Sequence, residues 1–200
     1  MKINEESLSL LKRATEALEI LASNKDFKIN ITKENGYVWN PENLKLMPVN
    51  KMNYIDLNLL KGIDHIKHLL LNNTKQFAKG FPANNVLLWG ARGMGKSSLV
   101  KSVHKELLNI SNKKRLILIE IHREDIKTLP ILINKLSNIK HNFILFCDDL
   151  SFDDNETNYK SLKTILDGGI EEKPSNIIFY ATSNRRHLIT RSINENEEST

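Results

Sequence analysis

The sequence has a single cysteine, Cys147, so no disulfide can form within the chain. Because Cys147 lies inside an apolar run, we expect it to be a small core residue. No apolar run approaches the roughly 18 residues that a membrane-spanning helix needs. The first six residues turn acidic and lack the apolar segment of a signal peptide. These absences predict a cytoplasmic protein that does not span a membrane.

Concentrated positive charge is also lacking, although 29 lysine and arginine residues against 24 acidic ones give a formal net charge of +5. Lysine, asparagine and isoleucine are all abundant, which indicates a compositional bias and not a basic face. The densest basic cluster, residues 113–115, falls where a turn is expected. Nucleic-acid binding is therefore possible but unsupported by the charge.

A phosphate-binding loop is the strongest motif present. Gly90–Ser97, GARGMGKS, fits G-x-x-x-x-G-K-[ST] throughout, with a short apolar run before it and a helical pattern after it. Its glycines let several N–H groups point at one anion, and the helix N-terminus adds positive charge. A glycine-rich turn with a surface lysine is the alternative. We predict that the nucleotide is bound by Gly90, Ala91, Arg92, Gly93, Met94, Gly95, Lys96, Ser97 and Ser98.

Three further apolar runs follow, at residues 115–121, 142–149 and 176–184. They do not alternate and are rich in β-branched or aromatic residues, which is typical of strands buried on both faces. Helical patterns separate them, around residues 126–139 and 159–166. This order predicts an α/β fold, a P-loop NTPase-type parallel sheet flanked by helices, with ligands at the carboxyl ends of the strands.

Asp148 and Asp149 end one of these runs. Paired aspartates after a strand more often form a solvated turn, but their place behind a complete phosphate loop favours a nucleotide site. We expect Asp148 and Ser97 to hold Mg²⁺, Asp148 mostly through water. Asp149 is the candidate catalytic residue that orients or deprotonates the attacking water.

Asn184 ends the next run and is the second candidate catalytic residue. Its side chain is suited to bond the γ-phosphate or the attacking water and so to sense which nucleotide is bound. A helix N-cap is the alternative reading of the same asparagine. Arg185 and Arg186 either reach phosphate in a neighbouring subunit or remain solvated.

The order of these motifs resembles an AAA+ ATPase, and residues 60–64 are similar to the segment that this family places beside the adenine. More closely, the chain resembles an uncharacterised bacterial branch, the domain-of-unknown-function family eight-one-five, in which paired aspartates are usual. The three stretches that carry this resemblance are residues 84–101, 146–152 and 180–188. The resemblance implies ATP and Mg²⁺ as cofactors, and self-association in a nucleotide-dependent ring or an unknown protein partner.

The C-terminal part departs from that resemblance. An AAA+ module continues with a fifth strand and a small helical lid, whereas this chain soon turns into a polar acidic tail of a kind typical of disorder. We therefore expect the fifth strand and lid to be missing, which leaves hydrolysis open because a trans arginine is worth about 10³–10⁵ in rate. The predicted regions are an N-terminal helix (residues 7–22) and mixed extension over 1–55, with residues 37–39 packed on the main domain, an ATP-binding core over 56–189, and the tail over 190–200.

The leading hypothesis is an ATP-binding AAA+-type protein, a Mg²⁺-dependent ATPase that couples nucleotide state to conformational change or assembly. One alternative is a nucleic-acid accessory protein resembling initiator and helicase-loader ATPases. Another is a truncated nucleotide switch that does not hydrolyse ATP. A small-molecule kinase uses the same loop, but its substrate pocket and lid arginines are not found in the sequence.

Overall fold

The computed structural model of this chain describes residues 29–110, 114–151 and 174–185. One compact unit begins at Ile31 and holds nearly all of them. Several sequence-based predictions lie outside the described residues, namely the helices at 7–22 and 159–166, the tail at 190–200, and the missing fifth strand and lid after residue 185.

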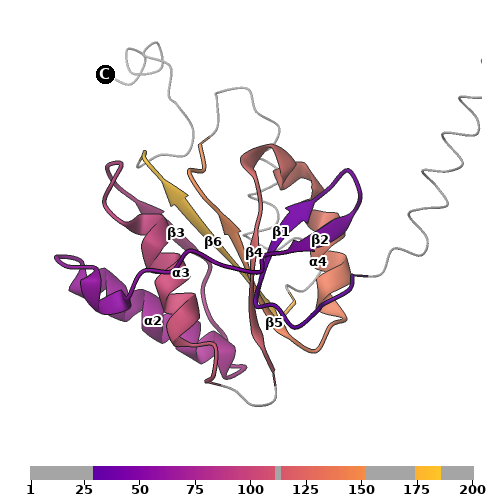
Figure 1. The fold of residues 1–200 in the computed structure, drawn as a ribbon, viewed down its shortest axis with the longest axis horizontal. Helices are drawn as coiled ribbons and strands as arrows, with labels where there is room; N and C mark the ends of the chain where they lie inside the picture. The colour runs from indigo at the N-terminus through magenta and orange to yellow at the C-terminus, as the bar shows by residue number, and fades with distance from the viewer. Residues whose placement is uncertain (1–28, 111–113, 152–173, 186–200) are drawn as a thin grey trace, which may run out of the picture. The chain divides into compact units, whose positions relative to one another are not determined.

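Within the described residues of this unit, the centre is a six-stranded sheet in the order β2-β1-β4-β5-β6-β3 (Figure 1). Every neighbouring pair is parallel except β1 and β2, which form an antiparallel hairpin. This mostly parallel sheet confirms the predicted α/β class. The strands are β1 (Gly36–Asn40), β2 (Lys45–Pro48), β3 (Val86–Trp89), β4 (Leu116–Glu120), β5 (Asn142–Cys147) and β6 (Ile177–Ser183).

The three apolar runs of the sequence form strands, as predicted, and these strands lie in the middle of the sheet. All residues of β5 and β6 are buried, as are all of β4 except its last. Cys147 is buried at the end of β5, where burial raises the pKa of its thiol to about 12, so it is the core residue expected. By contrast β3 forms one edge of the described sheet, and its Trp89 side chain is 55% exposed.

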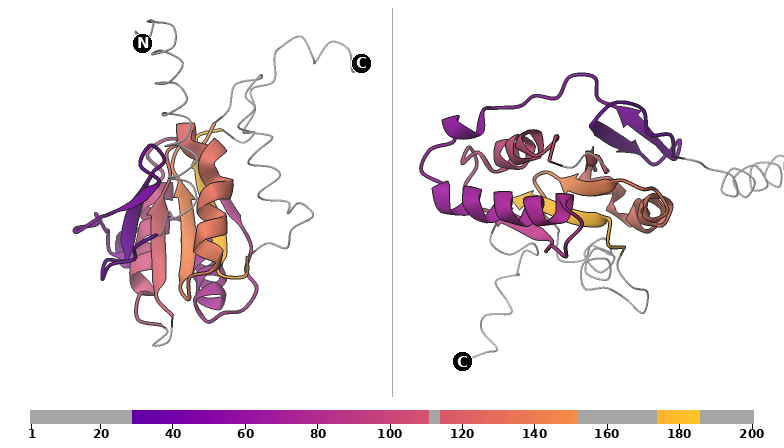
Figure 2. Two further views of the ribbon diagram at one scale, coloured as in Figure 1. Left: turned by 90° about the vertical axis from the view of Figure 1, so that its right-hand side faces the viewer. Right: turned by 90° about the horizontal axis from the view of Figure 1, so that it is seen from below.

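Helices cover both faces of the sheet (Figure 2). The helices α2 and α3 contact each other and share one apolar cluster with alternate residues of β4, β5 and β6. On the other face lies α4, whose leucines 129, 132 and 136 are buried. The helices are α2 (Asp64–Ala78), α3 (Lys96–Glu106) and α4 (Leu129–Ser137), with short 3₁₀ turns η1 (Leu57–Leu59) and η2 (Arg123–Thr128).

The β1–β2 hairpin belongs to the same sheet as the phosphate-loop strand, because β1 pairs in parallel with β4. Trp39 is 1% exposed, and its Nε1–H donates to Thr128 Oγ1 at 2.8 Å. The expected packing of residues 37–39 on the main domain is therefore confirmed. The compact unit begins at Ile31, whereas the sequence suggested a boundary near residue 55. The two differ because β1 meets β4 through contacts that are distant in sequence, which local patterns do not reveal.

A strap of residues 49–63 connects the hairpin to α2 and runs along α3. The Ser102 hydroxyl donates to the Ile55 carbonyl at 2.6 Å, and the Tyr54 ring stacks on His104 with centroids 6.2 Å apart. His104 is fully buried, and its Nε2 lies 3.1 Å from the Leu116 carbonyl oxygen. Burial lowers the pKa of His104 to about 4, so its ring is neutral at pH 7.

No helix among the described residues combines the length and apolar character needed to cross a membrane.

Candidate nucleotide-binding site

The phosphate-loop motif begins directly after β3, which ends at Trp89, and its last two residues, Lys96 and Ser97, open α3, as the strand–loop–helix prediction required. Gly93 and Gly95 have φ of 82° and 77°. In this left-handed conformation a residue with a side chain would be strained, whereas glycine is not. Gly95 caps α3 without a side-chain hydrogen bond, so N–H groups of the first helical turn remain available to an anion. The local geometry therefore suits a phosphate group.

The Lys96 ammonium lies over this loop and makes three hydrogen bonds. Its Nζ donates to the carbonyl oxygens of Gly90 and Ala91, each at 2.8 Å, and to Asn184 Oδ1 at 3.0 Å. An ammonium has three protons, so these bonds use its full donor capacity. A phosphate that approaches Lys96 must displace at least one of these oxygens.

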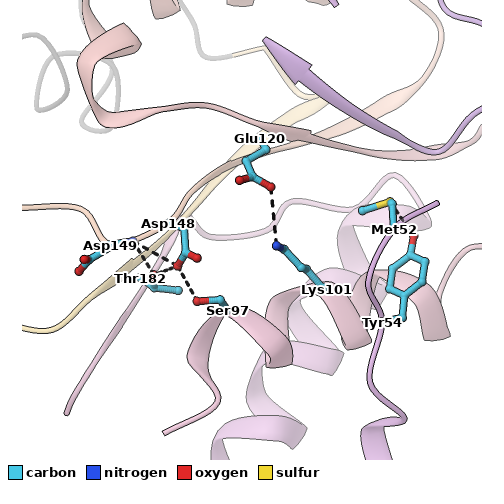
Figure 3. Close-up of polar contacts among 8 residues, drawn as sticks. All are labelled: Met52, Tyr54, Ser97, Lys101, Glu120, Asp148, Asp149 and Thr182. Carbon is cyan, nitrogen blue, oxygen red and sulfur yellow. Dashed lines mark hydrogen bonds and ion pairs between the residues drawn. The ribbon is translucent and has the colours of Figure 1, made fainter. Parts of the chain in front are cut away.

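Asp148 and Ser97, the predicted magnesium ligands, lie together in the structure. The Ser97 hydroxyl at the start of α3 donates to Asp148 Oδ1 at 2.5 Å, and the Asp149 N–H reaches the same oxygen at 3.1 Å (Figure 3). Thr182 Oγ1 also donates to Oδ1. A carboxylate next to a hydroxyl is the donor set that Mg²⁺ takes from a protein when phosphates and waters supply the rest. These residues fit that ion.

Asp149 has a left-handed backbone, with φ of 52°, which is uncommon for a residue other than glycine. Its carboxylate Oδ1 accepts a hydrogen bond of 2.6 Å from Asn184 Nδ2. The side chain of Asn184 therefore lies between Lys96 and Asp149, one of its polar atoms bonded to each. The two predicted catalytic residues are in contact with each other, and one of them also contacts the phosphate-loop lysine.

The other predicted nucleotide contacts lie at different depths. Ala91, Arg92, Gly93 and Met94 are exposed at the loop tip, whereas Ser98 is half-buried. Leu60 from the strap lies beside the loop, since a Cβ added to Gly95 would lie 3.5 Å from Leu60 Cδ2. Lys67 holds the strap, because its Nζ donates to the Leu60 carbonyl at 3.0 Å and pairs with Asp64 at 2.8 Å. Of the two arginines, Arg185 donates its backbone N–H to Ser183 Oγ, and Arg186 lies outside the described residues.

Sequence reasoning missed the residues that surround this set. Lys101, on α3, pairs with Glu120 at the carboxyl end of β4, with Nζ and Oε2 3.7 Å apart. A cavity of about 300 Å³ adjoins the two aspartates, a volume at the lower end for small-molecule sites. The one available signal was position, because residues 121–124 directly follow β4 as Asp148 directly follows β5. The cavity is lined by Glu120, Ile121, His122, Arg123, Glu124, Asp148, Asp149 and Ser151.

Comparison with known proteins gives one family and a set of solved structures. A model of the family described as "Protein of unknown function (DUF815)" matches residues 32–200. A search of curated proteins finds no match. A structure of a Thermotoga maritima RuvB point mutant is 19% identical with a TM-score of 0.45, over 68% of this chain and 43% of RuvB. PCH-2 of C. elegans is 12% identical with a TM-score of 0.43, over 98% of this chain and 68% of PCH-2. The chain thus spans less than half the length of RuvB.

Proposed function

The chain belongs to the DUF815 family of proteins of unknown function, and on that premise we propose that it is a Mg²⁺-dependent, AAA+-type ATP-binding protein that hydrolyses ATP. The observation that supports this most is that five polar side chains lie together, from the residues that follow β5 and β6 and from the N-terminus of α3. They carry an ammonium, a hydroxyl, an amide and two carboxylates, and come from Lys96, Ser97, Asp148, Asp149 and Asn184.

In this proposal the loop and α3 bind the phosphates. The backbone N–H groups of Gly93 and Gly95 and of the first turn of α3 donate to phosphate oxygens. Lys96 gives up the Asn184 or Ala91 oxygen and turns one proton to the nucleotide. Leu60, beside Gly95, packs against the adenine. The remaining bond of Lys96 to the Gly90 carbonyl keeps the ammonium in the loop.

Hydrolysis in this proposal depends on the carboxylates. When bound, Mg-ATP would supply the γ-phosphoryl group that passes to water with ADP as the leaving group, and the charge of the ion would offset the charge on the phosphate oxygens. Ser97 and Asp148 would hold the ion, Asp148 mostly through water. Asp149 orients the attacking water and takes up its proton. Asn184, already bonded to Asp149, responds to the γ-phosphate and thereby links nucleotide state to the end of β6.

We propose that the consequence of this cycle is nucleotide-dependent self-association or docking to a protein partner in the cytoplasm. Phosphate release measured against protein concentration tests this step, because turnover that requires assembly rises faster than linearly. A strictly linear rise argues that each chain acts alone.

Binding itself is tested by titrating the full chain with a fluorescent ATP analogue, with and without Mg²⁺. Lys96→Ala removes the ammonium and should weaken binding by about tenfold or more, since a hydrogen bond to a charged group is worth about 1.5–3 kcal/mol. Lys105→Ala, on the last turn of the same helix, is the matched control and should bind as the wild type does. A wild-type chain without affinity for Mg-ATP, or a Lys96→Ala variant with unchanged affinity, contradicts the proposal.

A further inference from the structure

Thr182 contacts the turn after β5 at three points. It lies near the end of β6 and is 1% exposed. Its hydroxyl donates to Asp148 Oδ1 and accepts the Asp149 N–H at 2.9 Å (Figure 3). Its carbonyl oxygen accepts the Leu150 N–H at 2.7 Å. One buried residue thus binds three consecutive residues of the neighbouring segment.

The register of the sheet explains this position. The last residue pair between β5 and β6 is Cys147 with Ala181, so Thr182 lies beside the first residue that follows β5. There the chain turns out of the sheet through Asp149, with its φ of 52°. Aspartate enters that conformation more readily than most L-residues but still less readily than glycine, so neighbouring bonds help to hold it there. The bonds from Thr182 supply this restraint.

A hydroxyl is the group that this position requires. It has one proton to donate and lone pairs to accept, so a single atom can serve a carboxylate and an N–H at once. Valine has nearly the same shape but neither capacity, and serine has both without the methyl group. The carbonyl bond to Leu150 belongs to the backbone, so it persists whichever of these residues is present.

The restraint reaches the proposed catalytic pair. Asn184 follows Thr182 by two residues and donates to the Asp149 carboxylate at 2.6 Å. Thr182 therefore fixes the Asp149 backbone on one side, and Asn184 fixes its carboxylate on the other. If the Asp149 backbone is released, the carboxylate changes its place relative to Asn184 and Lys96.

We propose that Thr182 is a positioning residue, whose hydroxyl holds Asp149 in its left-handed turn and so sets where the catalytic carboxylate lies. The restraint itself is a property of the nucleotide-free chain. Its effect on turnover rests on the function proposed above. A purely structural threonine is the competing explanation, and it predicts a change in stability with no separation between nucleotide binding and turnover.

The restraint is tested by amide hydrogen exchange in the nucleotide-free, full-length chain. In Thr182→Val the Asp149 N–H loses its 2.9 Å bond to Thr182 Oγ1 and keeps only the longer contact of 3.1 Å with Asp148 Oδ1. The Asp149 amide should therefore exchange about fivefold faster or more, as expected when a hydrogen bond of about 1 kcal/mol is lost. The Leu150 amide should keep its protection, and Thr182→Ser should restore that of Asp149. Unchanged exchange at Asp149 in a folded Thr182→Val variant overturns the proposal.

The catalytic effect is tested by steady-state kinetics with Mg-ATP. Thr182→Val should lower kcat about tenfold or more and change the dissociation constant for Mg-ATP less than about twofold, because a misplaced group costs rate more than binding. In an Asp149→Asn background, Thr182→Val should have no further effect on kcat. Additive effects, or equal losses of binding and turnover, overturn the positioning role.

The two measurements separate this inference from the proposed function. If the wild-type chain does not bind Mg-ATP, the proposed function fails, and the exchange experiment still decides whether Thr182 restrains Asp149. If the wild type binds Mg-ATP without turning it over, the catalytic half of the inference fails. Rescue of both exchange and kcat by Thr182→Ser supports the whole of it.

Discussion

Lys96 and Asp149 are connected through one amide, that of Asn184. Its Oδ1 accepts from Lys96 Nζ at 3.0 Å, and its Nδ2 donates to Asp149 Oδ1 at 2.6 Å. Only this orientation of the amide satisfies both partners, because an ammonium only donates and a carboxylate only accepts. The asparagine therefore competes with a phosphate for the lysine, which gives it opposite effects on binding and on turnover.

Asn184→Ala should separate these two effects. Loss of the amide frees one Lys96 proton, so affinity for Mg-ADP should rise by about fivefold, the equivalent of one hydrogen bond of about 1 kcal/mol. Turnover should fall, because Asp149 loses its partner. Calorimetric titration and phosphate release measure the two quantities. Weaker Mg-ADP binding by the variant would show that Asn184 stabilises the nucleotide-bound state and does not compete with phosphate for Lys96.

Asp149→Asn should abolish most turnover while leaving nucleotide binding intact. Asparagine tolerates the left-handed conformation of this position, where φ is 52°, and it keeps an oxygen for Asn184. It cannot accept a proton, and general-base catalysis typically contributes about 10²–10⁴ in rate. Single-turnover phosphate release and equilibrium ATP binding provide the comparison. Turnover within about twofold of wild type would remove Asp149 from its proposed role.

Ser97→Ala should raise the Mg²⁺ concentration needed for half-maximal nucleotide binding. The variant removes a hydroxyl that lies 2.5 Å from Asp148 Oδ1 and so takes away one of the two proposed ligands. Ser97→Thr keeps the hydroxyl and serves as the control. Titration with Mg²⁺ at fixed ATP checks this prediction, and identical curves for both variants would place the ion elsewhere.

His104 should make the fold less stable in mild acid. Its pKa is lowered to about 4 by burial, against 6.5 for an ordinary histidine, so the unfolded chain binds the extra proton between these values. The contribution of neutral His104 to the free energy of unfolding should therefore be fully present above pH 6.5. The free energy of unfolding should fall by up to about 3 kcal/mol as the pH approaches 4, at 1.36 kcal/mol for each pKa unit.

Urea unfolding of the wild type at a series of pH values measures this dependence. His104→Gln carries no titrating ring, so its stability should be lower at pH 7 but should vary less between pH 6.5 and 4. A variant with the same pH dependence as the wild type would assign the effect to other groups.

Truncation should locate the boundary of the folded unit. Removal of residues 1–30 leaves the compact unit whole, so its melting temperature should change little. Removal of residues 1–55 takes away β1 and exposes the edge of β4, and it also deletes the buried Trp39. Because truncation of a buried tryptophan to alanine alone costs about 3–5 kcal/mol, the shorter chain should not fold stably. Circular dichroism melts of both truncations decide the point.

The candidate site was readable from the sequence because its parts are local or lie at strand ends. The glycines, Lys96 and Ser97 are contiguous, and a run of eight residues defines the loop chemistry without knowledge of the rest. Asp148 and Asn184 each follow an unalternating apolar run, and the carboxyl ends of parallel strands meet at one edge of a sheet. Their proximity thus followed from the order of the elements.

Other features required the folded chain. The antiparallel β1–β2 hairpin joins the sheet through β4, which lies about eighty residues further along the chain, and short strands interrupted by proline carry no sign of that pairing. The left-handed backbone conformation of Asp149 could not be predicted from the sequence either, because most aspartates adopt other conformations. The cavity next to the aspartates depends on how the segments after β4 and β5 leave the sheet.

The sequence alone determined the α/β class and predicted a phosphate loop at residues 90–97, because hydrophobic runs and backbone conformation at glycine are properties of neighbouring residues. Only the tertiary structure decided which groups touch. The bonds from Thr182 to three consecutive residues, and the place of Asn184 between Lys96 and Asp149, depend on strand register. Register is set by packing between elements that are far apart in the chain, so no local pattern records it.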